Sequence, residues 1–242
     1  VRLPDVRSYI NVSTAVLGWV LFAGSVGALT SLLLSGRFVA RFGARNAVVV
    51  GFTVLGVGQI IQAFSLVGES PMGVALGGLV SGLGYGIGDV GINVEGAELE
   101  KLRGKSLLPQ LHGAYSLGAL LGAGIGTLAI VTHFSLEVQM ITIACITTAI
   151  AWFTYRQLPA STGKTHFVSG EKSQREPVVL SKRILFLGLG IMGLSLAEGG
   201  SNDWLALSVV DDYKLDTTGL EFDTEDFHTY ALLCYAEVTS GT

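Results

Sequence analysis

Long stretches of this sequence carry no charged residue. The uncharged stretches are residues 8–36, 46–68, 70–88, 106–136, 138–155 and 184–197. Most of them reach the roughly 20 apolar residues that a helix needs to cross a hydrocarbon core about 30 Å thick. The amphipathic pattern of a surface helix is missing from most of them. We therefore predict six membrane-spanning helices, over residues 13–35, 46–67, 71–94, 106–131, 136–156 and 184–208.

Composition agrees with a membrane protein. Hydrophobic residues make up 50% of the 242 residues and charged residues only 14%, whereas soluble domains carry about 25% charged residues. A soluble domain would have to bury helices of this length that have almost no polar face. The predicted fold class is therefore all-α, a polytopic membrane protein built as a helical bundle.

Basic residues are distributed unequally between the two sides of the predicted bundle. One side has twelve of the 15 Lys and Arg residues, namely Arg37, Arg41, Arg45, Lys101, Arg103, Lys105, Arg156, Lys164, Lys172, Arg175, Lys182 and Arg183. The other side has Arg2, Arg7 and Lys214. Because cytoplasmic loops are enriched in Lys and Arg, the first side is expected to be cytoplasmic and both chain ends outside. We expect a multi-pass protein of the cell membrane, in a bacterium the inner membrane.

Residues 86–91 spell G-x-G-x-x-G, the pattern of a dinucleotide-binding turn. Such a turn follows a strand, opens an amphipathic helix and precedes an acidic residue, and none of these features surrounds residues 86–91. In a membrane, small residues four positions apart let helix backbones approach closely. The sets with this spacing are Gly73/Gly77, Gly84/Gly88 and Gly118/Gly122/Gly126. We interpret them as helix-packing positions.

Asp89 lies within the third predicted span. A charged side chain near the centre of a membrane helix costs roughly 2.5–3.5 kcal/mol, and it is tolerated mainly where it faces protein or water. Ser81, Tyr85 and Asn93 share its helix face at four-residue spacing. We interpret this polar stripe as the lining of a cavity. The alternative is an aspartate that reaches the inner membrane interface.

Polar residues also occur on other predicted spans. His112 and Tyr115 lie near the start of the fourth span, and Gln59 and Gln62 form a weaker pair on the second. For His112 and the two glutamines, hydrogen bonding between helices is at least as good an explanation as contact with a ligand.

Glu198 and Asp203 interrupt the last predicted span, with Asn202 beside them. Within a bundle, either acid is a candidate to take up and release a proton near neutral pH. Alternatively, the helix ends near Glu198 and both acids lie in the outer headgroup region. The sequence leaves these two interpretations open.

Residues 36–45, GRFVARFGAR, connect the first two predicted spans. They resemble the signature loop of the major facilitator superfamily, G-x-x-x-D-R-x-G-R-R, at four positions: Gly36, Arg41, Gly43 and Arg45. Ala40 stands at the aspartate position, and Ala44 stands at the first arginine of the closing pair. Four further stretches resemble the fucose-permease-like bacterial branch of this superfamily: residues 2–7, 89–100, 108–126 and 197–207.

This resemblance implies a partial major facilitator bundle, whose six spans correspond to helices two to seven of the family. Residues 1–156 would form the N-terminal bundle without its first helix, and residues 157–183 the central cytoplasmic loop. Residues 184–210 would be the first helix of the second bundle. Residues 211–242 form an acidic tail that we expect to be weakly ordered.

The resemblance also implies secondary active transport of a small polar solute by alternating access, present here as a truncated chain. The expected solute contacts are Asp89, Asn93, His112, Tyr115, Glu198 and Asn202. Asp89 and Glu198 are the candidates for proton coupling, and the four matching loop residues would gate the conformational change. We expect no cofactor, metal or nucleic acid. The expected partners are the solute, the lipid bilayer and either a complementing half or a second copy.

Two other classes of function stay open. One is a non-transporting membrane fragment or scaffold. The other is a membrane-embedded enzyme with Asp89, Glu95 and His112 as an acid–base set. The sequence contains no nucleophile elbow, H-E-x-x-H or Walker pattern, so we expect no enzyme activity and no ATP coupling.

Overall fold

The computed structural model describes residues 2–164 and, beyond them, residues 185, 186, 189, 190, 193, 199, 204 and 207. The predicted span over 184–208 lies outside the described residues apart from these eight positions, and the tail over 211–242 lies wholly outside them. Six helices follow one another over the continuous part, and no strand occurs in it. The protein is all-α, as the sequence predicts.

Five of these helices are long and apolar enough to cross a membrane. They are α2 (Thr14–Phe42), α3 (Ala44–Val67), α4 (Pro71–Arg103), α5 (Leu108–Val131) and α6 (Leu136–Tyr155). A short helix, α1 (Leu3–Tyr9), precedes them. The side chains of Ser13 and Ser70 begin α2 and α4 by accepting hydrogen bonds from the backbone N–H groups of Val16 and Gly73. The chain is a multi-pass membrane protein.

Two helices extend beyond the predicted spans. Helix α2 continues to Phe42, past Arg37 and Arg41, and α4 continues to Arg103, where Gly104 ends it in the left-handed conformation at φ +61°. Hydropathy marks only the part of a helix that matches a hydrocarbon core, whereas the backbone hydrogen bonds continue through polar residues. We call the end of the bundle that carries Arg37, Arg41, Arg103 and the α2–α3 turn the basic end. We call the opposite end, where α1 lies, the α1 end.

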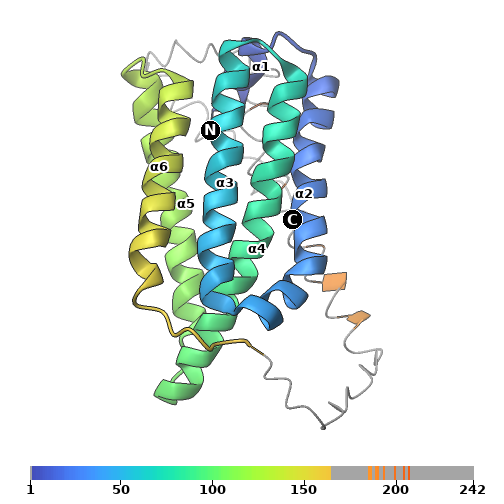
Figure 1. The fold of residues 1–242 in the computed structure, drawn as a ribbon. Helices are drawn as coiled ribbons and strands as arrows, with labels where there is room; N and C mark the ends of the chain where they lie inside the picture. Colours follow the sequence, from blue (N-terminus) through green and yellow to red (C-terminus); the bar gives the residue numbers. More distant parts are fainter. Residues whose placement is uncertain are drawn as a thin grey trace, which may run out of the picture.

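Helix α4 lies between α2 and α3 and packs against both (Figure 1). Glycines permit this close approach. A Cβ atom at Gly84 would lie 2.5 Å from the Gly51 carbonyl oxygen, and one at Gly82 would lie 2.8 Å from the Ala28 nitrogen. A Cβ at Gly77 would lie 2.8 Å from the Gln62 nitrogen. The packing roles predicted for Gly73/Gly77 and Gly84/Gly88 are therefore confirmed.

Serine hydroxyls on α2 bond across the same seam. Ser31 Oγ donates to the Gly82 carbonyl at 3.4 Å, and Ser35 Oγ donates to the Gly86 carbonyl at 3.3 Å. The G-x-G-x-x-G pattern at residues 86–91 thus lies inside a continuous helix and faces another helix. It is not a strand-to-helix turn.

Helix α6 packs beside α3 (Figure 1), whereas α5 has only a small contact with α4. Helix α6 contacts α3 through Trp152, whose Nε1 donates to Thr53 Oγ1 at 3.2 Å. Helix α5 is largely exposed: no described atom lies within 4 Å of a Cβ placed at Gly118 or Gly122. The packing role predicted for these two glycines is not realised among the described residues.

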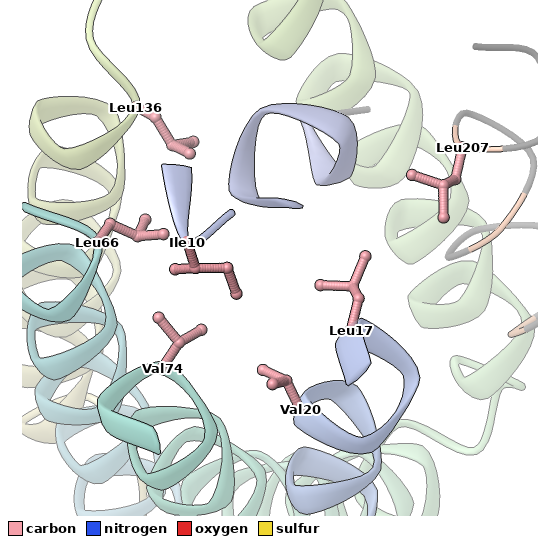
Figure 2. Packing of buried hydrophobic residues seen from close by; sticks show 7 residues of the cluster. All are labelled: Ile10, Leu17, Val20, Leu66, Val74, Leu136 and Leu207. Carbon is pink, nitrogen blue, oxygen red and sulfur yellow. The ribbon is translucent and has the colours of Figure 1, made fainter. Parts of the chain in front are cut away.

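The α1 end is closed by an apolar cluster that joins α1, α2, α3, α4 and α6. Figure 2 shows its buried members, which are Ile10, Leu17, Val20, Leu66, Val74, Leu136 and Leu207. Arg2 fixes α1 above the bundle by donating to the Phe134 carbonyl at 2.9 Å and to Gln139 Oε1 at 2.7 Å. Burial and the neighbouring Glu137 carboxylate raise the pKa of Tyr9.

Candidate functional site

The polar stripe of α4 faces two different neighbours. Ser81 Oγ donates to the Leu55 carbonyl of α3 at 3.4 Å. Two turns further along, Asp89 is half-buried and Asn93 is exposed, and Asn93 Nδ2 donates to the Asp89 carbonyl at 2.9 Å. The stripe is therefore not one uniform surface, because its Ser81 end packs on α3, whereas Asn93 is exposed.

Asp89 lies on the part of α4 that is near α5. The side chain of Asn93 interacts with its carboxylate, and the charge of His112 on α5 acts on it through space, without an ion pair between the two residues. The structure thus places these three predicted solute contacts in one region of the bundle. Tyr115 lies one turn further along α5 and is 56% exposed. Glu198 and Asn202 lie outside the described residues.

A second polar region lies nearer the α1 end, where α2, α3 and α4 enclose a cavity of about 420 Å³. Its polar lining consists of Ser25, Gln59, Gln62, Ser81 and Tyr85. Leu3 and Val6 of α1 also line it. We call it the α1-end cavity. The sequence signals it only weakly, through the Gln59/Gln62 pair, because those residues become neighbours of Ser81 and Tyr85 only after α3 packs on α4.

The four residues that match the signature loop have different surroundings at the basic end. Gly43 makes the turn from α2 to α3 at φ +89°, a conformation that favours glycine. Arg45 lies with its guanidinium carbon 4.1 Å from the centre of the Tyr155 ring, and its Nη2 donates to the Tyr155 hydroxyl at 3.2 Å. Arg41 is exposed, and a Cβ at Gly36 would meet nothing within 4 Å among the described residues.

Glu95 is the most deeply buried charged residue in the described part of the chain, at 4% exposure. Arg45 and Thr162 interact with its carboxylate, but within the described ranges neither oxygen has a partner with hydrogen-bond geometry. The nitrogen Nε of Arg45 is likewise buried without such a partner among these residues. A buried acid without an ion pair is costly to keep in place, so the surroundings of Glu95 make the basic end sensitive to substitution.

The segment after α6 returns to the α2–α3 turn. The backbone N–H of Ala44 donates to the Thr162 carbonyl at 2.9 Å, and Thr162 itself is 8% exposed. Gly163, at φ +74°, lies against Val39 and Val94. Residues 158–164 therefore cover the foot of α3 and the side chain of Glu95.

The acid–base set of the enzyme hypothesis is not assembled in the described part of the chain. Asp89 interacts with His112, whereas the interactions of Glu95 are with Arg45, Thr162 and Glu98. The three groups thus belong to two separate clusters.

Comparison with known proteins finds transporters. The chain is 25% identical over 208 residues to an uncharacterized MFS-type transporter of Yersinia pestis, and this alignment covers 85% of the chain and 51% of that protein. It is 30% identical over 223 residues to an uncharacterized transporter of Sinorhizobium fredii, covering 91% of the chain and 55% of the relative. These matches support membership of the major facilitator superfamily. The chain spans about half the length of these curated relatives.

No family model and no solved structure matches the chain. Both relatives are named as transporters, and the name of the first adds that it is of MFS type.

Proposed function

We propose that this chain is part of a secondary active transporter that moves a small polar solute across the cell membrane by alternating access. The observation that carries the proposal is Asp89, a half-buried acid in an apolar helix, with the side chain of Asn93 beside it and His112 of the neighbouring helix close enough for its charge to act on the carboxylate. An acid in such a setting is functional by default, because it is costly to keep in a membrane. The two relatives, named as transporters, support the same class.

In this mechanism Asp89, Asn93 and His112 contact the solute from the bundle of residues 1–156, with Tyr115 beside them. Glu198 and Asn202 face them from the helix at residues 184–210. Either Asp89 or Glu198 carries a coupling proton. A second bundle, supplied by a complementing half or by a second copy, forms the opposite wall of the pathway.

The signature loop gates the rocking of the bundles. Gly43 and Arg45 support this role, since one makes the α2–α3 turn and the other ties α3 to α6. The stretches at residues 89–100 and 108–126 favour the fucose-permease-like bacterial branch. The basic end then faces the cytoplasm, and in a bacterium the membrane is the inner one.

Proton coupling predicts a specific defect in Asp89→Asn. Sealed vesicles that contain a pH-sensitive dye should acidify when a transported solute is added to wild type, and this acidification should fall at least tenfold in Asp89→Asn. Solute exchange without a pH gradient should persist, because asparagine keeps the size and the polarity of the site. Glu98→Gln, an exposed acid on the same helix, is the control and should acidify like wild type. Unchanged acidification in Asp89→Asn would exclude coupling through Asp89.

Sidedness is testable by cysteine labelling in a variant in which Cys145 and Cys234 are replaced. Gly68→Cys, in the α3–α4 turn, should react with a membrane-impermeant maleimide added to intact cells. Arg41→Cys, an exposed position at the basic end, should react only after the cells are opened. Labelling of Arg41→Cys in intact cells would reverse the proposed orientation.

A further inference from the structure

The α1-end cavity is separate from the Asp89 cluster, although one helix serves both. Tyr85 lines the cavity and lies one turn from Asp89 on α4. The cavity volume of about 420 Å³ falls within the 300–1,000 Å³ typical of small-molecule sites. The space is therefore large enough for a small solute, and its lining must indicate which kind.

The polar lining of this cavity is uncharged. Amides from Gln59 and Gln62 and hydroxyls from Ser25, Ser81 and Tyr85 line it, and no Asp, Glu, Lys or Arg does so among the described residues. A charged solute would lose its hydration here without gaining an opposite charge, which is unfavourable in an apolar bundle. Amides and hydroxyls instead match neutral groups that donate and accept hydrogen bonds.

Gln59 provides an observation independent of the cavity's shape. Its Oε1 is buried and has no hydrogen-bond partner in the part of the chain that the structure describes. An unpaired buried acceptor costs about 1–3 kcal/mol, and this cost disappears when a donor is brought to it. Gln62 differs, because its side chain is packed closely against the backbone at Gly77 and Gly78. The free acceptor of the cavity is therefore Gln59.

We propose that the α1-end cavity binds an uncharged solute that carries hydroxyl or amide donors, and that Gln59 Oε1 accepts a hydrogen bond from it. This inference rests on the proposed transport function and narrows its solute class: the cavity is a second contact region for the solute, one turn along α4 from the Asp89 cluster. The cavity places the solute under α1, between α2, α3 and α4, next to the polar cluster of Asp89. The neutral solute and the coupling acid thus lie beside neighbouring turns of α4.

The test uses two series of probes of similar size that differ chiefly in charge. One series is glucose, glucuronate and glucosamine, and the other is succinamide and succinate. Binding to the purified full chain in nanodiscs is measured by the increase in Tm with probe concentration and by equilibrium dialysis. We expect the neutral member of at least one series to bind at least tenfold more tightly than its charged counterparts. Equal or tighter binding of the charged members, or no binding of glucose and succinamide, would overturn the proposal.

Variants locate the site. Gln59→Leu should weaken binding of the neutral probe about tenfold, the loss expected for one hydrogen bond. Its Tm without probe should not fall, because the substitution removes an unpaired acceptor. Gln110→Leu, an exposed glutamine on α5, is the matched control and should bind like wild type. Ser25→Ala, an exposed hydroxyl at the cavity, serves as a second variant should Gln59→Leu fold poorly, and it too should weaken binding.

Failure of the site and failure of the transport function give different results. Unchanged binding in Gln59→Leu and Ser25→Ala, together with solute uptake into vesicles, would overturn the site and leave the transporter intact. Binding that depends on Gln59 in a protein that moves no solute would retain the site and overturn the transport function.

Discussion

Gly84→Leu is expected to prevent α4 from packing against α3 and therefore to prevent assembly of the bundle formed by α2, α3 and α4. A Cβ at this position would lie 2.5 Å from the Gly51 carbonyl oxygen and 2.7 Å from the Leu55 Cα. Both obstacles are backbone atoms, so no side chain can turn away to make room. The helices would have to separate along the α3–α4 seam, which is the largest helix–helix contact among the described residues. We expect a loss of stability at or above the upper end of the 1–3 kcal/mol that overpacking typically costs.

Gly118→Leu is the matched control. It makes the same substitution in the middle of another apolar helix, but nothing described lies within 4 Å of a Cβ at Gly118. The measurement is the yield of monodisperse protein after size-exclusion chromatography, followed by thermal unfolding in detergent. Gly118→Leu should give the same yield of monodisperse protein as wild type, whereas Gly84→Leu should give little or none. Equal behaviour of the two variants would show that α3 and α4 do not pack through glycine.

Glu95→Lys is expected to have the second large effect. The side chain is buried and interacts with Arg45, whose Nε is also buried. Lysine would place a second positive charge near Arg45 at a position that is only 4% exposed. Burying a charge without an opposite partner costs on the order of several kcal/mol. The expected result is a strong decrease in the free energy of unfolding, measured by denaturant titration in mixed micelles.

Glu98→Lys makes the same change one turn along α4, on a side chain that is 42% exposed. It breaks only the surface contact with Lys101 at 3.6 Å, so the loss should stay below about 1 kcal/mol. A Glu95→Lys variant as stable as Glu98→Lys would contradict the burial of Glu95 against Arg45.

The membrane spans were the most predictable part of the fold. Charge-free segments located all five described long helices, because lipid requires apolar side chains over a fixed length. The ends at Phe42 and Arg103 were not predictable in the same way. Beyond the hydrocarbon core, helix length depends on backbone hydrogen bonds and on the glycines that end them, here Gly43 and Gly104.

The candidate site was predictable in part. Helical spacing placed Asp89 and Asn93 on one face of α4, and His112 was already among the expected solute contacts from the neighbouring helix. Spacing along one helix could not reveal the α1-end cavity, since its lining comes from three helices. It also gave no reason to expect a buried Glu95, whose surroundings depend on Arg45 and on residues after α6. The contrast between Gly84 and Gly118 has the same origin, since both have the spacing of a packing glycine and only one has a neighbour.

The hydrogen bond from the Ala44 N–H to the Thr162 carbonyl determines where the chain leaves the bundle. Although α6 ends at Tyr155, the following residues are anchored at the start of α3. A tilt of α3 would therefore carry residues 162–164 with it. The α2–α3 turn and these last continuously described residues thus move as one unit.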